Sequence, residues 1–288
     1  MADTTRIERT LEAIVARTEH PGGPPRLAEA VRYAVFPGGA RIRPRLCLAV
    51  AAACGDDQPD LTDAAAAAIE LMHCASLVHD DLPCFDDALT RRGRPAVHRA
   101  FGEPVAVLAG DALIVLAFQC LVRAAAEVPD RMGPLLTILG QSVGMPFGIV
   151  AGQAWECEPS ADLVEYQRAK TGELFAAAAV AGAAAAGREA EPWRLMGEQL
   201  GEAYQVADDI RDAVGSEQEL GKPVGRDQAL GRPSAVRHFG LAGAMARLEA
   251  LAAGAAAAVP PCSGAAAMRG LIHAEVRRLL AVSVAPAA

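Results

Sequence analysis

Apolar residues recur at helical spacing along most of the chain, and this pattern predicts a series of helices. The first expected helix covers residues 5–18 and ends before the breaker "PGGPP" at 21–25. The next covers residues 26–36 and stops at a glycine turn. A third, over residues 62–81, is apolar on every face, which is typical of a buried helix. Further helices are expected over the segments 40–55, 104–128, 134–155, 161–187 and 193–214.

The boundaries of the buried helix and of the last segment have their own signals. Thr62 or Asp63 is the candidate N-cap of the buried helix, and Pro83 is expected to mark its exit. Residues 215–235 are polar and rich in glycine, and helical pattern returns after them. We therefore expect a loop there rather than a linker between domains.

Composition narrows the fold class. Hydrophobic residues make up 52% of the 288 residues, whereas aromatic residues make up only 4%. The core must then consist largely of Ala, Leu and Val, which suits closely packed helices better than sheets. We predict an all-α fold in a single domain over residues 1–288.

Several classes of protein are disfavoured by composition and charge. No apolar run approaches the roughly 18 residues that a membrane span needs, and the N-terminus lacks the apolar region of a secretory signal. Seven cysteines without a C-x-x-C pair favour reduced thiols, and hence a cytoplasmic protein, over disulfides or a zinc site. A net charge of −8 argues against nucleic acid as a partner, although phosphorylated small molecules remain compatible if divalent metals mediate the contact.

Two acidic clusters stand out in this apolar chain. The first, in "LVHDDLPCFDDALTRRG", contains Asp80, Asp81, Asp86 and Asp87. The second, in "YQVADDIRDAV", places Asp208, Asp209 and Asp212 within about 100° of one helix face. Like charges repel at such spacing, so a bound cation is expected among them. Oxygen ligands alone favour a hard cation such as Mg²⁺.

Either cluster alone is more typical of a solvated helix end, but basic residues accompany both clusters. They are Arg41, Arg43, Arg91, Arg92, Lys170, Lys222 and Arg226. For Arg226 a surface role is the simpler interpretation. For Arg43, Arg91, Arg92 and Lys170, which lie beside turns and apolar helices, we favour phosphate binding.

Five ordered motifs together resemble one known family. "GGARIRP", "MHCASLVHDDLPCFDDALTRRGRPAVH", "KTGELF", "YQVADDIRD" and "GKPVGRD" are similar to those of the trans-isoprenyl diphosphate synthases, the polyprenyl synthetase family. The resemblance covers residues from about 25 to 240. It implies a helical bundle around a deep central cavity, the isoprenoid synthase fold, which is normally a homodimer. It also implies a DDxxxxD motif facing a DDxxD motif across the mouth of that cavity.

The resemblance assigns roles to matching residues. Three Mg²⁺ ions, for which Mn²⁺ can substitute, would be held by Asp80, Asp81, Asp86, Asp208 and Asp212. The allylic diphosphate would contact Arg91, Lys170, Thr171, Gln205 and Lys222. Isopentenyl diphosphate would bind Arg43, His73 and Arg92. Neutralising the departing pyrophosphate with metal, Arg and Lys is what allows an allylic cation to form.

The chain departs from the family pattern at two positions. Ala40 stands where the glycine turn usually continues with lysine, so one contact to isopentenyl diphosphate is missing, and Arg41 or Arg43 would have to compensate. Arg232 replaces a common lysine and keeps its charge.

Product length is partly encoded one turn before the first cluster. Ala75 and Ser76 are small, whereas a bulky aromatic there closes the cavity at fifteen carbons in the family. Together with the long DDxxxxD form, this resembles bacterial geranylgeranyl diphosphate synthases and predicts a twenty-carbon product. Leu71, Met72 and Phe118 are candidates for a deeper floor, although core packing explains each of them as well.

Three alternatives stay open on the sequence. A farnesyl diphosphate synthase differs only in product length. A helical phosphohydrolase with His-Asp metal ligands needs further histidines, which the second acidic cluster lacks. A non-catalytic partner subunit of the same fold should have lost carboxylates from one cluster, and both clusters are intact, so Ala40 is its only support.

Overall fold

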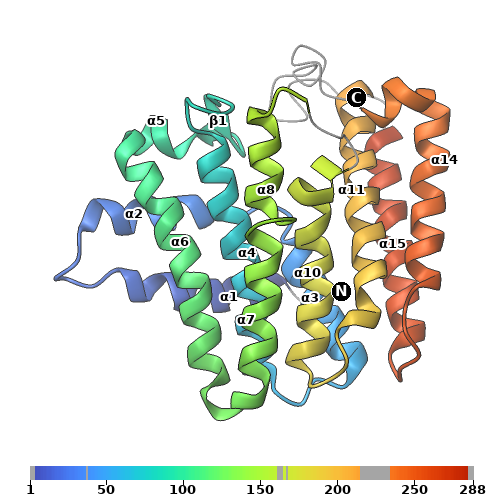
Figure 1. Ribbon diagram of the computed structural model, residues 1–288, viewed down its shortest axis with the longest axis horizontal. Coiled ribbons are helices and arrows are strands. Elements are labelled where there is room, and N and C mark those ends of the chain that lie inside the picture. Colours follow the sequence, from blue (N-terminus) through green and yellow to red (C-terminus); the bar gives the residue numbers. More distant parts are fainter. Residues whose placement is uncertain (1–3, 37, 161–164, 167, 215–233, 285–288) are drawn as a thin grey trace.

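The computed structural model describes residues 4–36, 38–160, 165–166, 168–214 and 234–284, with side chains described as far as residue 279. Long helices lie side by side in a bundle, with α4, α10 and α3 toward its middle (Figure 1). In the described part, the α-helices are α1 (Thr4–Val15), α2 (Pro25–Val35), α3 (Ile42–Cys54), α4 (Pro59–Asp80), α5 (Val97–Phe101), α6 (Glu103–Ala124), α7 (Pro129–Val143), α8 (Ile149–Ala154), α10 (Glu173–Ala185), α11 (Arg194–Val214), α14 (Ala235–Ala257) and α15 (Ala265–Val284).

Shorter elements connect these helices. They are the 3₁₀ turns η1 (Ala16–Thr18), η2 (Ala125–Glu127), η3 (Trp155–Cys157) and η5 (Glu191–Trp193), and the π-helical turn η4 (Arg168–Gly172). Among the described residues, strand structure is limited to the antiparallel pair β1 (Thr90–Arg91) and β2 (Arg94–Pro95). The all-α prediction is therefore confirmed, and the deep central cavity stays a prediction.

Small side chains set how closely the central helices approach. Every residue of α10 is buried, and nine of the thirteen are Ala or Gly by the sequence "ELFAAAAVAGAAA". A Cβ at Gly182 would lie 2.3 Å from the carbonyl oxygen of Cys47, so α10 and α3 pack almost backbone to backbone. On α4, Leu71 and Met72 are almost fully buried, and burying each such side chain contributes about 1.5–3 kcal/mol.

Helix boundaries differ from the sequence prediction at two places. The helix α4 starts at Pro59, with Gln58 at the N-cap position, so neither Thr62 nor Asp63 caps it. Proline is suited to the first helical turn because its missing N–H would lack an intrahelical partner there. The predicted helix over 134–155 is two helices, α7 and α8, because Gly144, Pro146 and Gly148 interrupt it.

Two helices are long and apolar enough to cross a membrane by length and composition alone. They are α4, whose apolar window is 78% buried, and the segment Glu103–Glu127, whose window is 44% buried. Each window contains a charged residue, Glu70 in α4 and Asp111 in α6, so the expectation that no uninterrupted apolar run approaches 18 residues holds. The burial of α4 is typical of a core helix, and α6 leaves an apolar face exposed.

Candidate active site

The first acidic cluster forms where α4 ends. Asp80 is the last residue of α4, and the chain then folds back so that the backbone N–H of Asp86 donates to the carbonyl oxygen of Asp80 over 3.0 Å. A second backbone bond, from Ala88 to Asp81, closes the same loop at 3.1 Å. These backbone hydrogen bonds bring Asp80 and Asp86 together.

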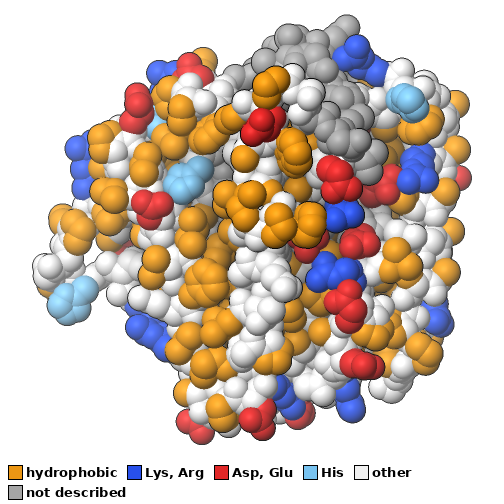
Figure 2. Space-filling model, in the orientation of Figure 1, with side chains coloured by type: hydrophobic (Ala, Val, Ile, Leu, Met, Phe, Trp, Pro, Cys, Tyr) orange, Lys and Arg blue, Asp and Glu red, His pale blue; other side chains and the backbone are white. Residues whose placement is uncertain are grey.

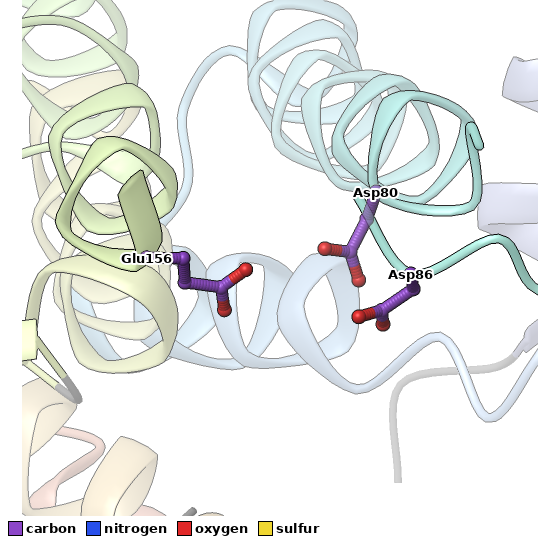
Figure 3. Close-up of side chains that lie close together, drawn as sticks. All are labelled: Asp80, Asp86 and Glu156. Atoms are coloured by element: carbon purple, nitrogen blue, oxygen red, sulfur yellow. The ribbon is translucent and has the colours of Figure 1, made fainter. Parts of the chain in front are cut away.

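A third carboxylate joins these two from a distant part of the chain. Asp80, Asp86 and Glu156 each offer an oxygen, and the three oxygens lie within 4.8 Å of one another. In Figure 3 the two aspartates point toward Glu156 across the space between α4 and the end of α8. Sequence reasoning missed Glu156. Seventy residues separate it from Asp86, and it is a single acid outside both clusters.

Lys170 lies between the two sides of this acidic group. Its ammonium Nζ donates to Asp80 Oδ1 over 3.1 Å and to Glu156 Oε1 over 2.5 Å. Burial alone would lower the pKa of Lys170, but Asp80 and Glu156 outweigh it and the pKa is raised. Burial also raises the pKa of Asp80, Lys170 opposes this and Asp86 adds to it. The group thus holds more negative charge than one lysine balances.

The β1–β2 hairpin positions two arginines. Its two-residue loop, Arg92–Gly93, has positive φ at both residues, which is the geometry of a tight type I′ hairpin turn. Arg91 Nε donates to both oxygens of Asp81, at 3.0 and 3.2 Å, and the Arg91 Nη2 lies 3.9 Å from Asp80. Asp81 is 1% exposed, so its carboxylate pairs with Arg91 while Asp80 lies near Asp86 and Glu156.

A second group of positive charge lies near the glycine turn. Arg43 lies over the Phe175 ring at 4.3 Å, and its Nε is buried without a hydrogen-bond partner among the described residues. Burial lowers the pKa of Arg43 to about 10. Burial also lowers the pKa of His73 well below its usual value, and Arg43 and Arg92 add to this. His73 is therefore neutral at pH 7, and Arg43 has capacity for an anion.

The glycine turn itself lies against these groups. A Cβ at Gly39 would sit 3.3 Å from Arg92 Nε, and a Cβ at Gly38 would overlap the guanidinium of Arg41 at 2.1 Å. The Arg41 side chain is fully buried and donates to Glu70, Glu8 and the Val35 carbonyl. Arg41 is thus committed to the fold, and of the two arginines suggested to compensate for Ala40 only Arg43 is available.

The second acidic cluster separates into two faces of α11. Asp208 is exposed and paired with Arg211, whereas Asp209 is buried and accepts from the Ala235 backbone N–H over 2.7 Å at the start of α14. Asp212 is half-buried. Asp208 and Asp212 as metal ligands stay a prediction, and Asp209 is committed to the contact with α14.

A hydrogen-bond chain links α11 to Lys170. Thr171, the next residue after Lys170, donates to Gln205 Oε1 over 3.3 Å, and Gln205 donates to Asp209 over 3.1 Å. These bonds join Thr171, Gln205 and Asp209, and the diphosphate-binding roles of Lys170, Thr171 and Gln205 stay predictions. Lys222 lies outside the described residues.

The predicted site residues lie within the segment that a known protein family matches. The polyprenyl synthetase family model matches residues 24–257. The chain belongs to the polyprenyl synthetase family. A geranylgeranyl diphosphate synthase of Cereibacter sphaeroides is 54% identical over 285 residues, which cover 99% of each chain. A geranylgeranyl diphosphate synthase of Rhodobacter capsulatus is 50% identical over 96% of this chain and 95% of its own.

Solved structures of the family have the same fold. The geranylgeranyl pyrophosphate synthetase of Pyrococcus horikoshii superimposes with a TM-score of 0.80 at 28% identity, over 98% of this chain and 96% of its own. A geranyltransferase of Helicobacter pylori, complexed with magnesium and isoprenyl diphosphate, has a TM-score of 0.77 at 28% identity, over 96% and 99% of the two chains.

The residues of the acidic group fit a divalent metal. All three are oxygen donors, and an ammonium group already lies between them, where a cation is favoured. In the described part of the chain, this group of carboxylates has the spacing of a metal site. Asp208 and Asp212 are not part of it.

Proposed function

We propose that this chain is a geranylgeranyl diphosphate synthase, which condenses isopentenyl diphosphate with allylic diphosphates. The observation that supports this most directly is the pairing of an acidic, lysine-bearing mouth at the end of α4 with a separate arginine-histidine group beside it. The acidic group suits the metal-bound allylic diphosphate, which departs as pyrophosphate. The arginine-histidine group suits isopentenyl diphosphate, whose diphosphate stays on the product. The names of the relatives support the twenty-carbon product.

The allylic diphosphate is proposed to bind at the end of α4. Bound Mg²⁺ would neutralise the negative charge that grows on the departing pyrophosphate. Asp80 and Asp86 are the proposed ligands on one side, with Asp208 and Asp212 on the other. Lys170 and Arg91 point positive charge at the same place, and Thr171 and Gln205 orient the diphosphate. Asp81 holds Arg91 in place, and we propose this role for Asp81 in preference to metal binding.

Isopentenyl diphosphate is proposed to bind Arg43, His73 and Arg92. A neutral His73 can donate one hydrogen bond while the two arginines carry the charge. The C4 carbon of isopentenyl diphosphate then attacks the allylic cation, and the proton that is lost passes to the departed pyrophosphate. Charge-assisted hydrogen bonds of this kind fix a phosphate firmly.

The proposal includes three magnesium ions per site, with Mn²⁺ as a substitute. The two sets of carboxylates support more than one ion, because four aspartates from two separate segments exceed the few that one Mg²⁺ takes from protein. A cytoplasmic location is proposed from the seven cysteines, all of which are free thiols.

A homodimer is also part of the proposal. On α6 the exposed apolar residues Val107, Leu108, Val115 and Val122 follow one helix face. Hydrophobic side chains lie along this helix in Figure 2, and Met145, Phe147 and Val150 add to the exposed apolar surface nearby in sequence. Across a two-fold axis, this apolar face would pack against the same face of a second copy of the chain.

The experiment that tests the reaction is incubation with both substrates. Purified protein is mixed with Mg²⁺, isopentenyl diphosphate and farnesyl diphosphate, and the products are identified by mass spectrometry. Condensation that stops when a chelator removes the metal supports the proposal. Hydrolysis without condensation would indicate the phosphohydrolase, and absence of turnover would indicate a partner subunit.

A further inference from the structure

Glu156 has three partners that hold its carboxylate in one orientation. Oε1 accepts from Lys170 over 2.5 Å and from the Tyr166 hydroxyl over 2.6 Å, while Oε2 accepts from Gln153 over 3.0 Å. Its side chain is 21% exposed, and that of Lys170 is 20% exposed. A carboxylate anchored by two neutral donors keeps its place even when the lysine moves.

The backbone fixes the separation of the two residues. Glu156 lies in η3 just after α8, and Lys170 lies in the π-helical turn η4. At Gly152 the two segments are in direct contact, since a Cβ there would lie 2.4 Å from the backbone nitrogen of Lys170. π-helical turns are rare and frequent at functional sites, because they redirect one side chain. The close approach thus carries Lys170 toward Glu156.

If Asp80 binds the metal as proposed, its contact with Lys170 has to weaken when the substrate binds. In the structure the ammonium lies 3.1 Å from Asp80, whose oxygens are also the proposed metal ligands. A metal-bound diphosphate would draw the Asp80 carboxylate away from the lysine. The lysine then needs another anion to keep it at the mouth of the site.

We propose that Glu156 is a positioning residue for Lys170, whose carboxylate keeps the ammonium beside the diphosphate site after Asp80 has turned to the metal. This inference rests on the proposed function of the acidic mouth. When the metal and diphosphate bind, Lys170 would pass from Asp80 to the diphosphate while Glu156 retains it.

A double-mutant cycle tests this without turnover. Binding of inorganic pyrophosphate in the presence of Mg²⁺ is measured by calorimetry for the wild type, Glu156→Gln, Lys170→Met and the double variant. We expect Glu156→Gln to weaken binding about fivefold when Lys170 is present and less than twofold when it is Met, because coupled residues are not additive. Equal losses in both backgrounds would overturn the proposal, as would no loss.

Two further measurements separate the alternatives. Glu158→Gln, which removes the same charge from an exposed position two residues away, is the matched control and should leave pyrophosphate binding within twofold. Mn²⁺ binding without diphosphate, followed by electron paramagnetic resonance, should change less than twofold in Glu156→Gln. A tenfold loss of Mn²⁺ affinity would make Glu156 a metal ligand and contradict the positioning role. Because these readouts need no condensation, they stay informative if the proposed reaction is wrong.

Discussion

At the residue scale, replacing Asp80 at the end of α4 should affect activity and stability differently. Burial raises the pKa of Asp80, so at neutral pH its charge opposes folding, since a carboxyl with a raised pKa loses stability as pH rises. Asp80→Asn should therefore leave the melting temperature unchanged or slightly higher, while kcat falls on the order of 10³-fold. Asp208→Asn should lower kcat similarly.

Steady-state kinetics and thermal unfolding of both variants measure this prediction. Asp130→Asn, an exposed position at the start of α7, is the matched control and should keep normal kcat. Turnover near that of the wild type in Asp80→Asn would show that the acidic mouth is not the catalytic centre.

The buried arginine beside the glycine turn should matter for stability. Arg41→Met leaves Glu70, which is 2% exposed, without its main cation, and breaking a buried ion pair costs about 3–5 kcal/mol. Urea unfolding should show this loss, while exposed Arg17→Met should cost less than about 1 kcal/mol. Equal stability of the two variants would show that the pair is not structural.

At Ala40, a substitution should improve the binding of isopentenyl diphosphate. Ala40 is exposed at the glycine turn, next to the residue whose missing Cβ makes room for Arg92. Ala40→Lys should lower the KM of isopentenyl diphosphate about tenfold, because a charge-assisted hydrogen bond contributes about 1.5–3 kcal/mol. The KM of the allylic substrate should barely change. If neither KM moved, residue 40 would lie away from the site.

At the element scale, α4 is proposed to set the product length. Ala75 is 2% exposed on α4, one turn before Asp80, so a ring there has to displace its neighbours or fill the space of an isoprene unit. Ala75→Tyr should shorten the main product from twenty to fifteen carbons while the first condensation keeps its rate. Chromatography of the products over time measures both. Unchanged length would show that another element sets it.

The helices also show which parts of the fold could be predicted from the sequence. Periodicity placed α1, α2, α4 and α11 because apolar faces repeat over many residues. It missed the break between α7 and α8, although Gly144, Pro146 and Gly148 are turn residues, because the apolar pattern continues across them. Glu156 was missed for a different reason: the packing of α8 against η4, close at Gly152, brings it to Lys170, and no local pattern records a contact between distant segments.

Arg41 was suggested for the site by the sequence but has a structural role. Its position beside the glycine turn made it a candidate for substrate binding, yet its partners Glu8 and Glu70 lie 33 and 29 residues away, and burial decides its role. By contrast, Asp80, Asp86, Lys170, Thr171 and Gln205 were assigned to one site by resemblance, and the structure places them in contact directly or through one another.

At the scale of the whole molecule, the exposed face of α6 predicts self-association. Replacing Leu108 and Val115 by Asp places charge in that face, so this variant should sediment as a monomer and the wild type as a dimer. Leu195→Asp, at an exposed apolar site on α11, should stay dimeric. Identical sedimentation of both variants would place the interface elsewhere.

The most direct test of the proposed function is the length of the final product. Labelled isopentenyl diphosphate is supplied with Mg²⁺ and either geranyl or farnesyl diphosphate, and the products are separated by chain length after complete turnover. We expect a twenty-carbon diphosphate from both primers and no condensation without metal. Accumulation of a fifteen-carbon product from geranyl diphosphate, with farnesyl diphosphate left unused, would contradict the proposed function.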